Sequence, residues 1–323
     1  MNHGWTYFDR PIHADIGLTV LAYYLRHHTH SSEAEWRVRL AEGRVTCNGR
    51  TVSAEVTLKT GDALAWARPP WEEPDVPRAF TILYEDDDLL AVDKPAGLPV
   101  LPGGGYVENT LLHLLRLRTP EGPPIPVHRL GRGTSGVLLF ARSALARRQL
   151  AADFRDSTRR ASGSLRKIYR ALTGPAPGLP GVLEITQPIG PVAHPALGSV
   201  HAASPAGKPA QSNCRILRRT PYDTLWEIDL ITGRPHQIRI HLAWAGAPLL
   251  GDPLYGSGGV PRIPTDGRAP VPGDGGYQLH ACSLTLTHPR SGARLTFSVP
   301  PPEALAAPGE AVSAGPTGKK REH

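Results

Sequence analysis

The chain has 323 residues, which is enough for roughly two domains of about 100 to 200 residues each. Lysine and arginine outnumber aspartate and glutamate by 36 to 29, and the net charge of +7 favours a polyanionic partner such as nucleic acid or an anionic membrane. The three cysteines, Cys47, Cys214 and Cys282, lack C-x-x-C spacing, so the sequence indicates neither a disulfide framework nor a zinc site.

Apolar stretches are short throughout the sequence. The first residues, MNHGWTYFDR, lack the apolar core of a signal peptide, and no stretch approaches the roughly 18 apolar residues that a membrane span needs. We therefore expect a cytoplasmic protein that does not enter the membrane, and we expect a monomer.

The first part of the chain predicts a small helix and hairpin unit over residues 1–67. Residues 21–28 and 33–42 are predicted to form two short helices, because their apolar residues recur at helical spacing. Residues 44–60 predict a strand, a turn at Asn48-Gly49 and a second strand, since Asn-Gly favours the tight turn of a hairpin.

Four arginines fall close together in this unit: Arg37, Arg39, Arg44 and Arg50. They can contact phosphates without reading bases, although such a cluster is also often a solvated charged face. The segments WRVRL from Trp36 and GRVTCNGR from Gly43 resemble the alpha-L RNA-binding module of ribosomal and RNA-modifying proteins. The resemblance implies a small N-terminal α/β module whose four arginines bind RNA.

Two stretches of the sequence lack the pattern of regular elements. Residues 68–78, RPPWEEPDVPR, hold four prolines and several acids, which predicts an extended connector. The end of the chain mixes proline, alanine and glycine and has too few large apolar groups to offset its ordering entropy. We therefore predict a second domain over residues 79–302 and a disordered tail over residues 303–323.

Strand and helix patterns alternate in the second domain. Residues 89–92 and 137–141 are apolar runs that predict buried strands, and Ser143 is placed to cap a following helix. Residues 226–230 and 295–299 alternate apolar and polar side chains, which predicts strands with one buried face. The pattern predicts an α+β domain with a mainly antiparallel mixed sheet and flanking helices.

Four stretches of this domain carry the strongest functional signal. In chain order they are ILYEDDDLLAVDKPAGLPV from Ile82, VHRLGRGTSGVLLFARS from Val127, KIYRAL from Lys167 and TGRPHQIRIHLAWAGAPLLGDPLYG from Thr232. At this spacing they resemble the RluA-type family of RNA pseudouridine synthases. The resemblance implies the pseudouridine synthase fold and an enzyme that flips a uridine out of ribosomal or transfer RNA and reattaches its base through carbon 5. It also implies that no cofactor or metal is needed.

The resemblance assigns roles to four positions. In the family an aspartate after H-R-L attacks the nucleoside, and in this sequence that position is Gly131. An arginine that helps to hold the opened site corresponds to Arg129, and a tyrosine that stacks on the base corresponds to Tyr169. An arginine that pairs with the aspartate corresponds to Arg239. By burial statistics alone, a strand tyrosine is usually core and a helical arginine usually a surface charge.

Other polar residues of these motifs are candidates for RNA contact: His128, Arg132, Lys167, Arg234 and His236. Two other chemistries fit the sequence less well. No glutamate follows His236, so the H-E-x-x-H metal pattern is absent. A G-x-S-x-G hydrolase motif would require glycine at Val137.

The glycine at position 131 leaves two hypotheses open. Loss of a nucleophile costs on the order of a millionfold in turnover, which favours an RNA-binding protein that has lost the chemistry. An unpaired buried Arg239 would be strongly destabilising, however, so another anion should stand beside it. Asp252, Asp93 and an RNA phosphate are the candidates, and a replacement carboxylate would make the chain a pseudouridine synthase with an unusual catalytic centre.

Overall fold

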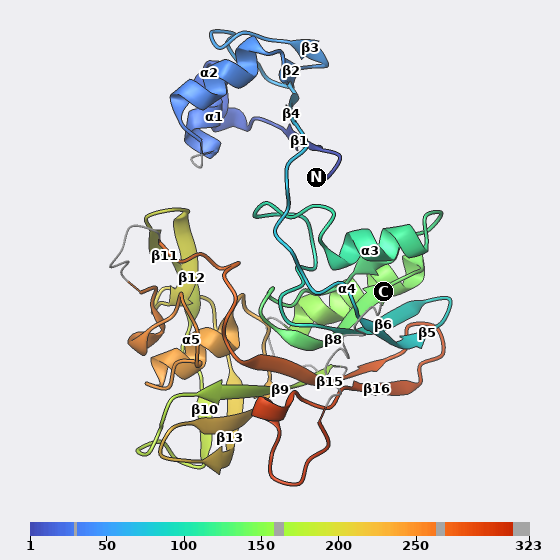
Figure 1. The fold of residues 1–323 in the computed structure, drawn as a ribbon, viewed down its shortest axis with the longest axis vertical. Helices are drawn as coiled ribbons and strands as arrows, with labels where there is room; N and C mark the ends of the chain where they lie inside the picture. Colours follow the sequence, from blue (N-terminus) through green and yellow to red (C-terminus); the bar gives the residue numbers. More distant parts are fainter. Residues whose placement is uncertain (29–30, 158–164, 263–268, 313–323) are drawn as a thin grey trace, which may run out of the picture. The chain divides into compact units, whose positions relative to one another are not determined.

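The computed structural model describes residues 1–28, 31–157, 165–262 and 269–312. The chain divides into two compact units, Met1–Pro74 and Asp75–His323, shown in Figure 1. The division lies inside the proline-rich stretch that predicts a connector. The beginning of that stretch belongs to the first unit, because the backbone N–H of Asn2 donates to the carbonyl of Trp71 at 3.0 Å.

The first unit combines two short helices with a four-stranded sheet in the order β1-β4-β2-β3. Its elements are β1 (Trp5–Asp9), η1 (His13–Asp15), α1 (Val20–His27), α2 (Glu33–Ala41), β2 (Val45–Cys47), β3 (Arg50–Thr51) and β4 (Leu64–Arg68). Side-chain caps start both α-helices: Thr19 accepts from the N–H of Ala22, and Ser32 forms a capping box with Glu35. The two predicted helices are confirmed to within one residue at each end.

The predicted turn of the N-terminal hairpin is confirmed by its backbone. Asn48 and Gly49 have φ values of 53° and 79°, the left-handed pair that a two-residue hairpin turn requires. The second strand is only Arg50–Thr51, much shorter than predicted. Trp36 holds the unit together, because its buried ring stacks on Tyr24 at 4.3 Å and meets Trp66 edge-on at 4.9 Å.

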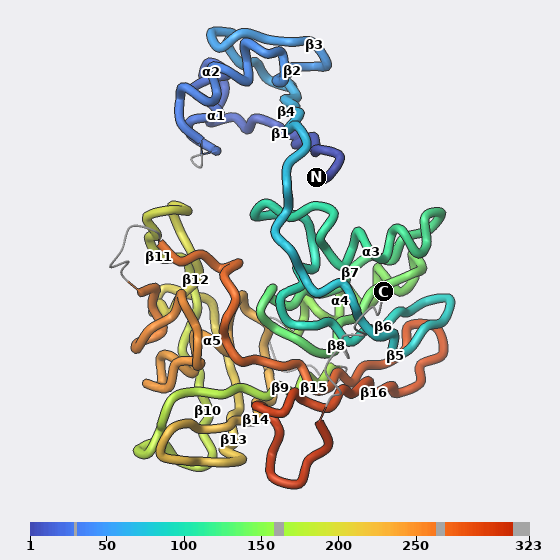
Figure 2. Tube along the Cα trace, viewed as in Figure 1, coloured from blue at the N-terminus to red at the C-terminus, as the bar shows by residue number. Residues whose placement is uncertain are grey.

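The second unit is built on a ten-stranded sheet, whose path is followed in Figure 2. Eight strands lie in the order β10-β13-β14-β9-β15-β8-β6-β5, with β16 paired to β15 and β7 paired to β8. Their bounds are β5 (Thr81–Glu85), β6 (Leu89–Lys94), β7 (Ile125–Pro126), β8 (Ser135–Ala141), β9 (Arg166–Thr173), β10 (Val182–Ile185), β13 (Ser212–Arg219), β14 (Thr224–Leu230), β15 (Leu279–Thr287) and β16 (Arg294–Ser298). All pairings are antiparallel except that of β8 with β15, which confirms the predicted α+β class with a mainly antiparallel mixed sheet.

Short helices and one hairpin flank this sheet. They are α3 (Leu111–Arg118), α4 (Ala144–Ser157), α5 (Gln237–Trp244), η2 (Ser257–Gly259), η3 (Glu303–Leu305) and the hairpin of β11 (Ile189–His194) with β12 (Gly198–Ala203). The predicted cap of α4 is present, because Ser143 Oγ accepts from the N–H of Ala146 at 3.1 Å. None of the helices in the described ranges is both long and apolar enough to cross a bilayer.

Two apolar clusters cover the two faces of strand β6. Leu90 and Val92 pack into one cluster, and Leu89 and Ala91 pack into the other, as expected for side chains that alternate along a strand. The first cluster also contains four residues that come from the functional motifs or lie next to them: Leu130, Tyr169, Tyr277 and Ile238. The candidate site is therefore built on one face of the sheet.

The prediction of a disordered tail over residues 303–323 is wrong for its first part. Leu305 is buried against Leu172 and Leu225, and Glu310 forms an ion pair with Arg170 at 3.0 Å. Leu305 and one partly buried ion pair anchor this segment despite its poor composition. The remaining residues of the predicted tail, 313–323, lie outside the described residues.

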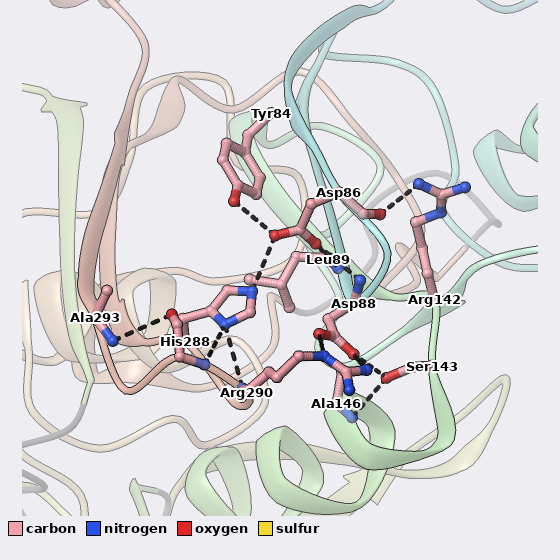
Figure 3. A network of polar contacts seen from close by, with 11 residues as sticks. Tyr84, Asp86, Asp88, Leu89, Arg142, Ser143, Ala146, His288, Arg290 and Ala293 are labelled. Atoms are coloured by element: carbon pink, nitrogen blue, oxygen red, sulfur yellow. Dashed lines mark hydrogen bonds and ion pairs between the residues drawn. The ribbon is translucent and has the colours of Figure 1, made fainter.

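A network of polar contacts links residues of the β5–β6, β8–α4 and β15–β16 connections (Figure 3). Asp86 accepts from Tyr84 at 2.6 Å and bonds His288 at 2.9 Å, while Asp88 bonds Ser143 and pairs with Arg290 at 2.6 Å. The bonds to Arg290 and Ser143 lower the pKa of Asp88 to about 2. The network ties the β5–β6 turn to the start of α4 and to the β15–β16 turn.

Candidate functional site

The segment that leads into helix α5 is held in one conformation by Gln237. The Gln237 side-chain oxygen accepts from Thr232 Oγ1 at 2.8 Å and from the N–H of Arg234 at 3.0 Å. Its amide nitrogen donates to Ser212 Oγ at 2.9 Å. His236 at the helix N-cap has a φ of 57°, a strained value for a residue with a side chain. Such strain is maintained by the surrounding bonds and is typical of functional sites.

Arg239 and Asp252 form a buried ion pair with two hydrogen bonds. Arg239 Nε donates to Asp252 Oδ2 at 2.7 Å, and Arg239 Nη2 donates to Asp252 Oδ1 at 2.8 Å. The two side chains are 3% and 0% exposed. The fork of a guanidinium matches the two oxygens of a carboxylate, which makes such a pair both strong and directional. Asp252 is therefore the anion that stands beside Arg239.

Two tyrosines border this ion pair. The Arg239 guanidinium carbon lies 4.1 Å from the ring centre of Tyr277 and 5.0 Å from that of Tyr255. Tyr255 is fixed, since its hydroxyl donates to the carbonyl of His201 and bonds His236 Nδ1, both at 2.7 Å. The hydroxyl of Tyr277 has a weaker contact, 3.4 Å from Thr134 Oγ1.

Tyr277 fills the place where a side chain at position 131 would project. A Cβ added to Gly131 would lie less than 3.0 Å from Tyr277 Oη, closer than a real Cβ approaches another atom. A Cβ at Gly133 would lie 3.0 Å from two carbons of the same ring. Neither glycine has a left-handed φ, so the obstacle to a side chain is the space taken by neighbours. At Gly131 that neighbour is the Tyr277 hydroxyl, and at Gly133 it is the Tyr277 ring together with Gly275 Cα at 3.3 Å.

A buried lysine holds the backbone beside Gly131. Lys94 Nζ donates to the carbonyls of Pro95 and Leu98 at 2.8 Å and to that of Arg132 at 3.3 Å. The N–H of Gly97 donates to the same Arg132 carbonyl at 2.8 Å. Burial lowers the pKa of Lys94 to about 7. Three converging carbonyls thus offset the cost of burying this ammonium group.

Tyr169, the predicted stacking residue, lies in the same apolar cluster as Tyr277. Its register partners are Ile228 on β14 and Ala281 on β15, and burial raises the pKa of its hydroxyl. Tyr169 is buried, so a base could reach the ring only after neighbouring groups had moved.

His128 and Lys167 each contact α4. His128 stacks on Phe154 with ring centres 4.6 Å apart and accepts from the N–H of Leu139 at 3.1 Å. Lys167 Nζ lies 3.3 Å from Ser157 Oγ. Burial lowers the pKa of His128 to about 3 and that of Lys167 to about 8. At neutral pH the imidazole is therefore uncharged.

The predicted arginines differ in their surroundings. Burial is the main cause that lowers the pKa of His236 to about 3, and the charges of Arg239 and Arg129 lower it further. Arg129 itself is exposed. Arg132 donates to the carbonyl of Gly273 at 2.8 Å, and Arg234 donates to the carbonyl of Pro209 at 3.0 Å. These two arginines therefore brace loops of the site.

Asp93, the other carboxylate candidate, points away from this cluster. It follows Leu89 and Ala91 at alternate positions of β6, and these pack into the cluster on the opposite face. Burial raises the pKa of Asp93. The structure brings Asp252, and not Asp93, to Arg239.

The four arginines of the first unit are mostly engaged with neighbours. Arg37 pairs with Glu33 at 2.8 Å, and Arg44 pairs with Glu42 at 2.7 Å. Arg39 lies between two indoles, 4.4 Å from the ring centre of Trp36 and 4.6 Å from that of Trp66. Within the described ranges Arg50 forms no ion pair, and it is exposed.

Sequence reasoning missed Tyr277 and Lys94. Tyr277 lies directly before the QLHACSLTLTHP stretch, outside the four motifs, and only the fold brings it to Gly131. Lys94 stands inside the first motif, and its place after an apolar strand was the available signal for a buried lysine. The pair Gly131 and Gly133 was itself a signal, because two glycines where side chains are expected leave room for a bulky neighbour.

Comparison with known proteins adds the family. Residues 88–244 match the family model described as RNA pseudouridylate synthase. A protein of Synechocystis sp., named an uncharacterized RNA pseudouridine synthase, is 45% identical over 90% of this chain and 96% of its own length. RNA pseudouridine synthase 5 of Oryza sativa subsp. japonica is 39% identical over 94% of this chain and 88% of its own length.

Solved structures are similar in fold. Human RNA pseudouridylate synthase domain containing 1 has a TM-score of 0.54 at 22% identity, and it matches 73% of this chain and 89% of its own. Human RNA pseudouridylate synthase domain containing 4 has a TM-score of 0.51 at 24% identity, with 70% and 90% covered. With a relative 45% identical over nearly the whole length, the chain belongs to the RNA pseudouridine synthase family.

Proposed function

We propose that the protein isomerises a uridine of structured RNA to pseudouridine, at a centre in which Gly131 stands in the place of the family's aspartate. The main support is the Arg239–Asp252 ion pair. Arg239 is the arginine that the family motif assigns to the site, and this pair provides it with a carboxylate. Ribosomal RNA is the first substrate to test, because a relative from Nitrosomonas europaea, 38% identical, is named ribosomal large subunit pseudouridine synthase D. Transfer RNA is the second.

A second candidate function is RNA binding without the chemistry. Its support is that Asp252 is fully engaged. Asp252 Oδ1 accepts from Arg239 and from the N–H groups of Leu254 and Tyr255, at 2.9 Å and 3.1 Å for the two backbone donors. A carboxylate with this many bonds and no exposed surface is a poor nucleophile as it stands.

The release of the hydrogen on carbon 5 separates the two functions. Pseudouridine formation replaces the bond from C5 to hydrogen with a bond to the ribose, so uridine tritiated at C5 loses its label to water. The full chain would be incubated with unmodified ribosomal and transfer RNA transcripts that carry this label. Tritium release is expected from one of them. Binding of both without release would reject the synthase and leave the RNA-binding candidate.

Phosphate contacts of the first unit are expected to come from Arg50 and not from Arg39. Replacing Arg50 with glutamine should reduce the slope of log affinity against log salt by about 0.7 to 0.9, the contribution of one phosphate contact. Replacing Arg39 with glutamine should leave the slope unchanged, because that guanidinium is already held between Trp36 and Trp66. Affinities of both variants for one structured RNA at several salt concentrations give the slopes. Equal slopes for wild type and the Arg50 variant would contradict this assignment.

A further inference from the structure

The hydroxyl of Tyr277 lies where the Cβ of a side chain at position 131, the aspartate position of the family motif, would be. The built Cβ of Gly131 meets Tyr277 Oη before any other atom, so the phenol oxygen lies where the first atoms of a side chain at 131 would be. Gly133 has the same relation to the ring carbons of Tyr277. The two glycines and the tyrosine are a matched set, in which each glycine makes room for the ring.

Tyr277 Oη is also less engaged in hydrogen bonds than the carboxylate of Asp252 or the hydroxyl of Tyr255. Among the described residues its one hydrogen-bond partner is Thr134 Oγ1, and the distance of 3.4 Å is long for a bond between hydroxyls. The carboxylate of Asp252 makes four shorter bonds, and the hydroxyl of Tyr255 makes two at 2.7 Å. Of these three groups, Tyr277 would lose the least hydrogen bonding when it forms a bond to a substrate.

The surroundings of the ring suit a hydroxyl that develops negative charge. The Arg239 guanidinium lies over the ring of Tyr277 at 4.1 Å and is kept in place by Asp252. A fixed cation beside a group that becomes negative stabilises that charge without further reorganisation. Tyrosine is one of the side chains that form covalent intermediates, and it does so at the anomeric carbon in sialidases.

We infer that Tyr277 is the nucleophile of this chain and that its oxygen attacks C1′ of the bound uridine. The inference rests on the proposed function, since it names the catalytic group of that reaction. Tyr277 is 4% exposed, so the uridine reaches it only when the segment that carries it shifts. Such a shift would have to break the bonds from Arg132 Nε to the Gly273 carbonyl at 2.8 Å and from Arg239 Nη1 to the Pro272 carbonyl at 3.4 Å.

The reaction balances without a further reagent. Tyr277 Oη bonds to C1′ as the bond from C1′ to N1 breaks, and the phenolic proton passes to N1 of the departing uracil. The uracil then turns, its C5 bonds to C1′, and the bond from C1′ to Oη breaks. The proton from C5 returns to the phenolate, so the net change moves the base from N1 to C5 and one hydrogen from C5 to N1.

The substitution Tyr277→Phe tests the hydroxyl while keeping the ring that packs against Gly131 and Gly133. Tritium release from labelled RNA is expected to fall by at least about a thousandfold, as for loss of a nucleophile. RNA affinity should change by less than about threefold, because the ring remains. The exposed Tyr222, replaced by phenylalanine, is the matched control and should keep full activity.

A second measurement separates chemistry from packing. Replacing Tyr277 with a ring-fluorinated tyrosine keeps the shape of the side chain and makes the phenol more acidic. The basic part of the pH–rate profile should then move to lower pH, a change that a packing role would not produce.

Three results are informative. An active wild type with an inactive Tyr277→Phe variant and a shifted fluorotyrosine profile supports Tyr277 as nucleophile. An active Tyr277→Phe variant, within tenfold of wild type, overturns the inference and leaves the proposed function intact. A wild type without tritium release on any RNA overturns both.

Discussion

Replacing Asp252 with asparagine is expected to lower the free energy of unfolding by about 3 to 5 kcal/mol. Asparagine keeps an oxygen for the backbone N–H groups of Leu254 and Tyr255, so the change removes mainly the charge. The guanidinium of Arg239, only 3% exposed, would then be buried without a counter-charge. Urea unfolding of the full chain, followed by tryptophan fluorescence, to which the buried Trp226 contributes, measures the loss.

Two controls isolate the cause of that loss. The double variant with Asp252→Asn and Arg239→Met removes both charges and should recover most of the stability, because no uncompensated charge remains. The variant Asp229→Asn breaks a surface pair with Arg166, which is 64% exposed, and should cost less than about 1 kcal/mol. Equal losses for Asp252→Asn and Asp229→Asn would refute the buried-charge explanation.

Placing an aspartate at Gly131 is expected to destabilise the protein by about 1 to 3 kcal/mol, the usual cost of overpacking a filled site. The obstacle is the hydroxyl of Tyr277, which lies where the new Cβ must go, and not the backbone conformation of Gly131. In a Tyr277→Ala background, which removes this obstacle, Gly131→Asp should destabilise the protein less. The double-mutant cycle of these two substitutions measures the coupling, which should be at least about 0.5 kcal/mol.

Gly174→Ala is the matched control for that cycle. A Cβ at Gly174 meets nothing within 4 Å, and its φ is not left-handed, so the substitution should be close to neutral. Additive effects of Gly131→Asp and Tyr277→Ala would mean that the two positions do not share one space. If only the double variant with Gly131→Asp and Tyr277→Ala released tritium, the result would support the second candidate function, RNA binding without the chemistry.

The fold was predictable where local signals decide structure. The Asn48-Gly49 turn, the Ser143 cap and the apolar run of β8 each act within a few residues, and all are present. Strands β1 and β4 were not predicted, because their pairing partners lie far along the chain and their own patterns are short. The packed segment around Leu305 was missed because one leucine in a poor stretch gives no periodicity.

The candidate site was predictable to the level of its motif residues. The need of Arg239 for an anion followed from the cost of a buried charge, and Asp252 was among the groups proposed to meet it. To choose between Asp252 and Asp93, one must know which residues of β6 face the site. Sequence spacing shows that the side chains alternate but does not show which face of the sheet carries the site. Tyr277 could not be found, because nothing in its own segment reports its distance from Gly131.

The parallel pairing of β8 with β15 has a consequence for synthesis on the ribosome. His280 of β15 pairs with Ser135 of β8, so the centre of the sheet joins parts of the chain that are made far apart in time. The first unit, Met1–Pro74, has its own contacts and can fold as soon as it emerges. The site around Gly131 and Arg239 cannot form until Tyr277 and β15 have been synthesised. The nascent chain therefore exposes the unpaired edges of β8 and β9 until its last strands are translated, and this interval is when it most needs protection from aggregation.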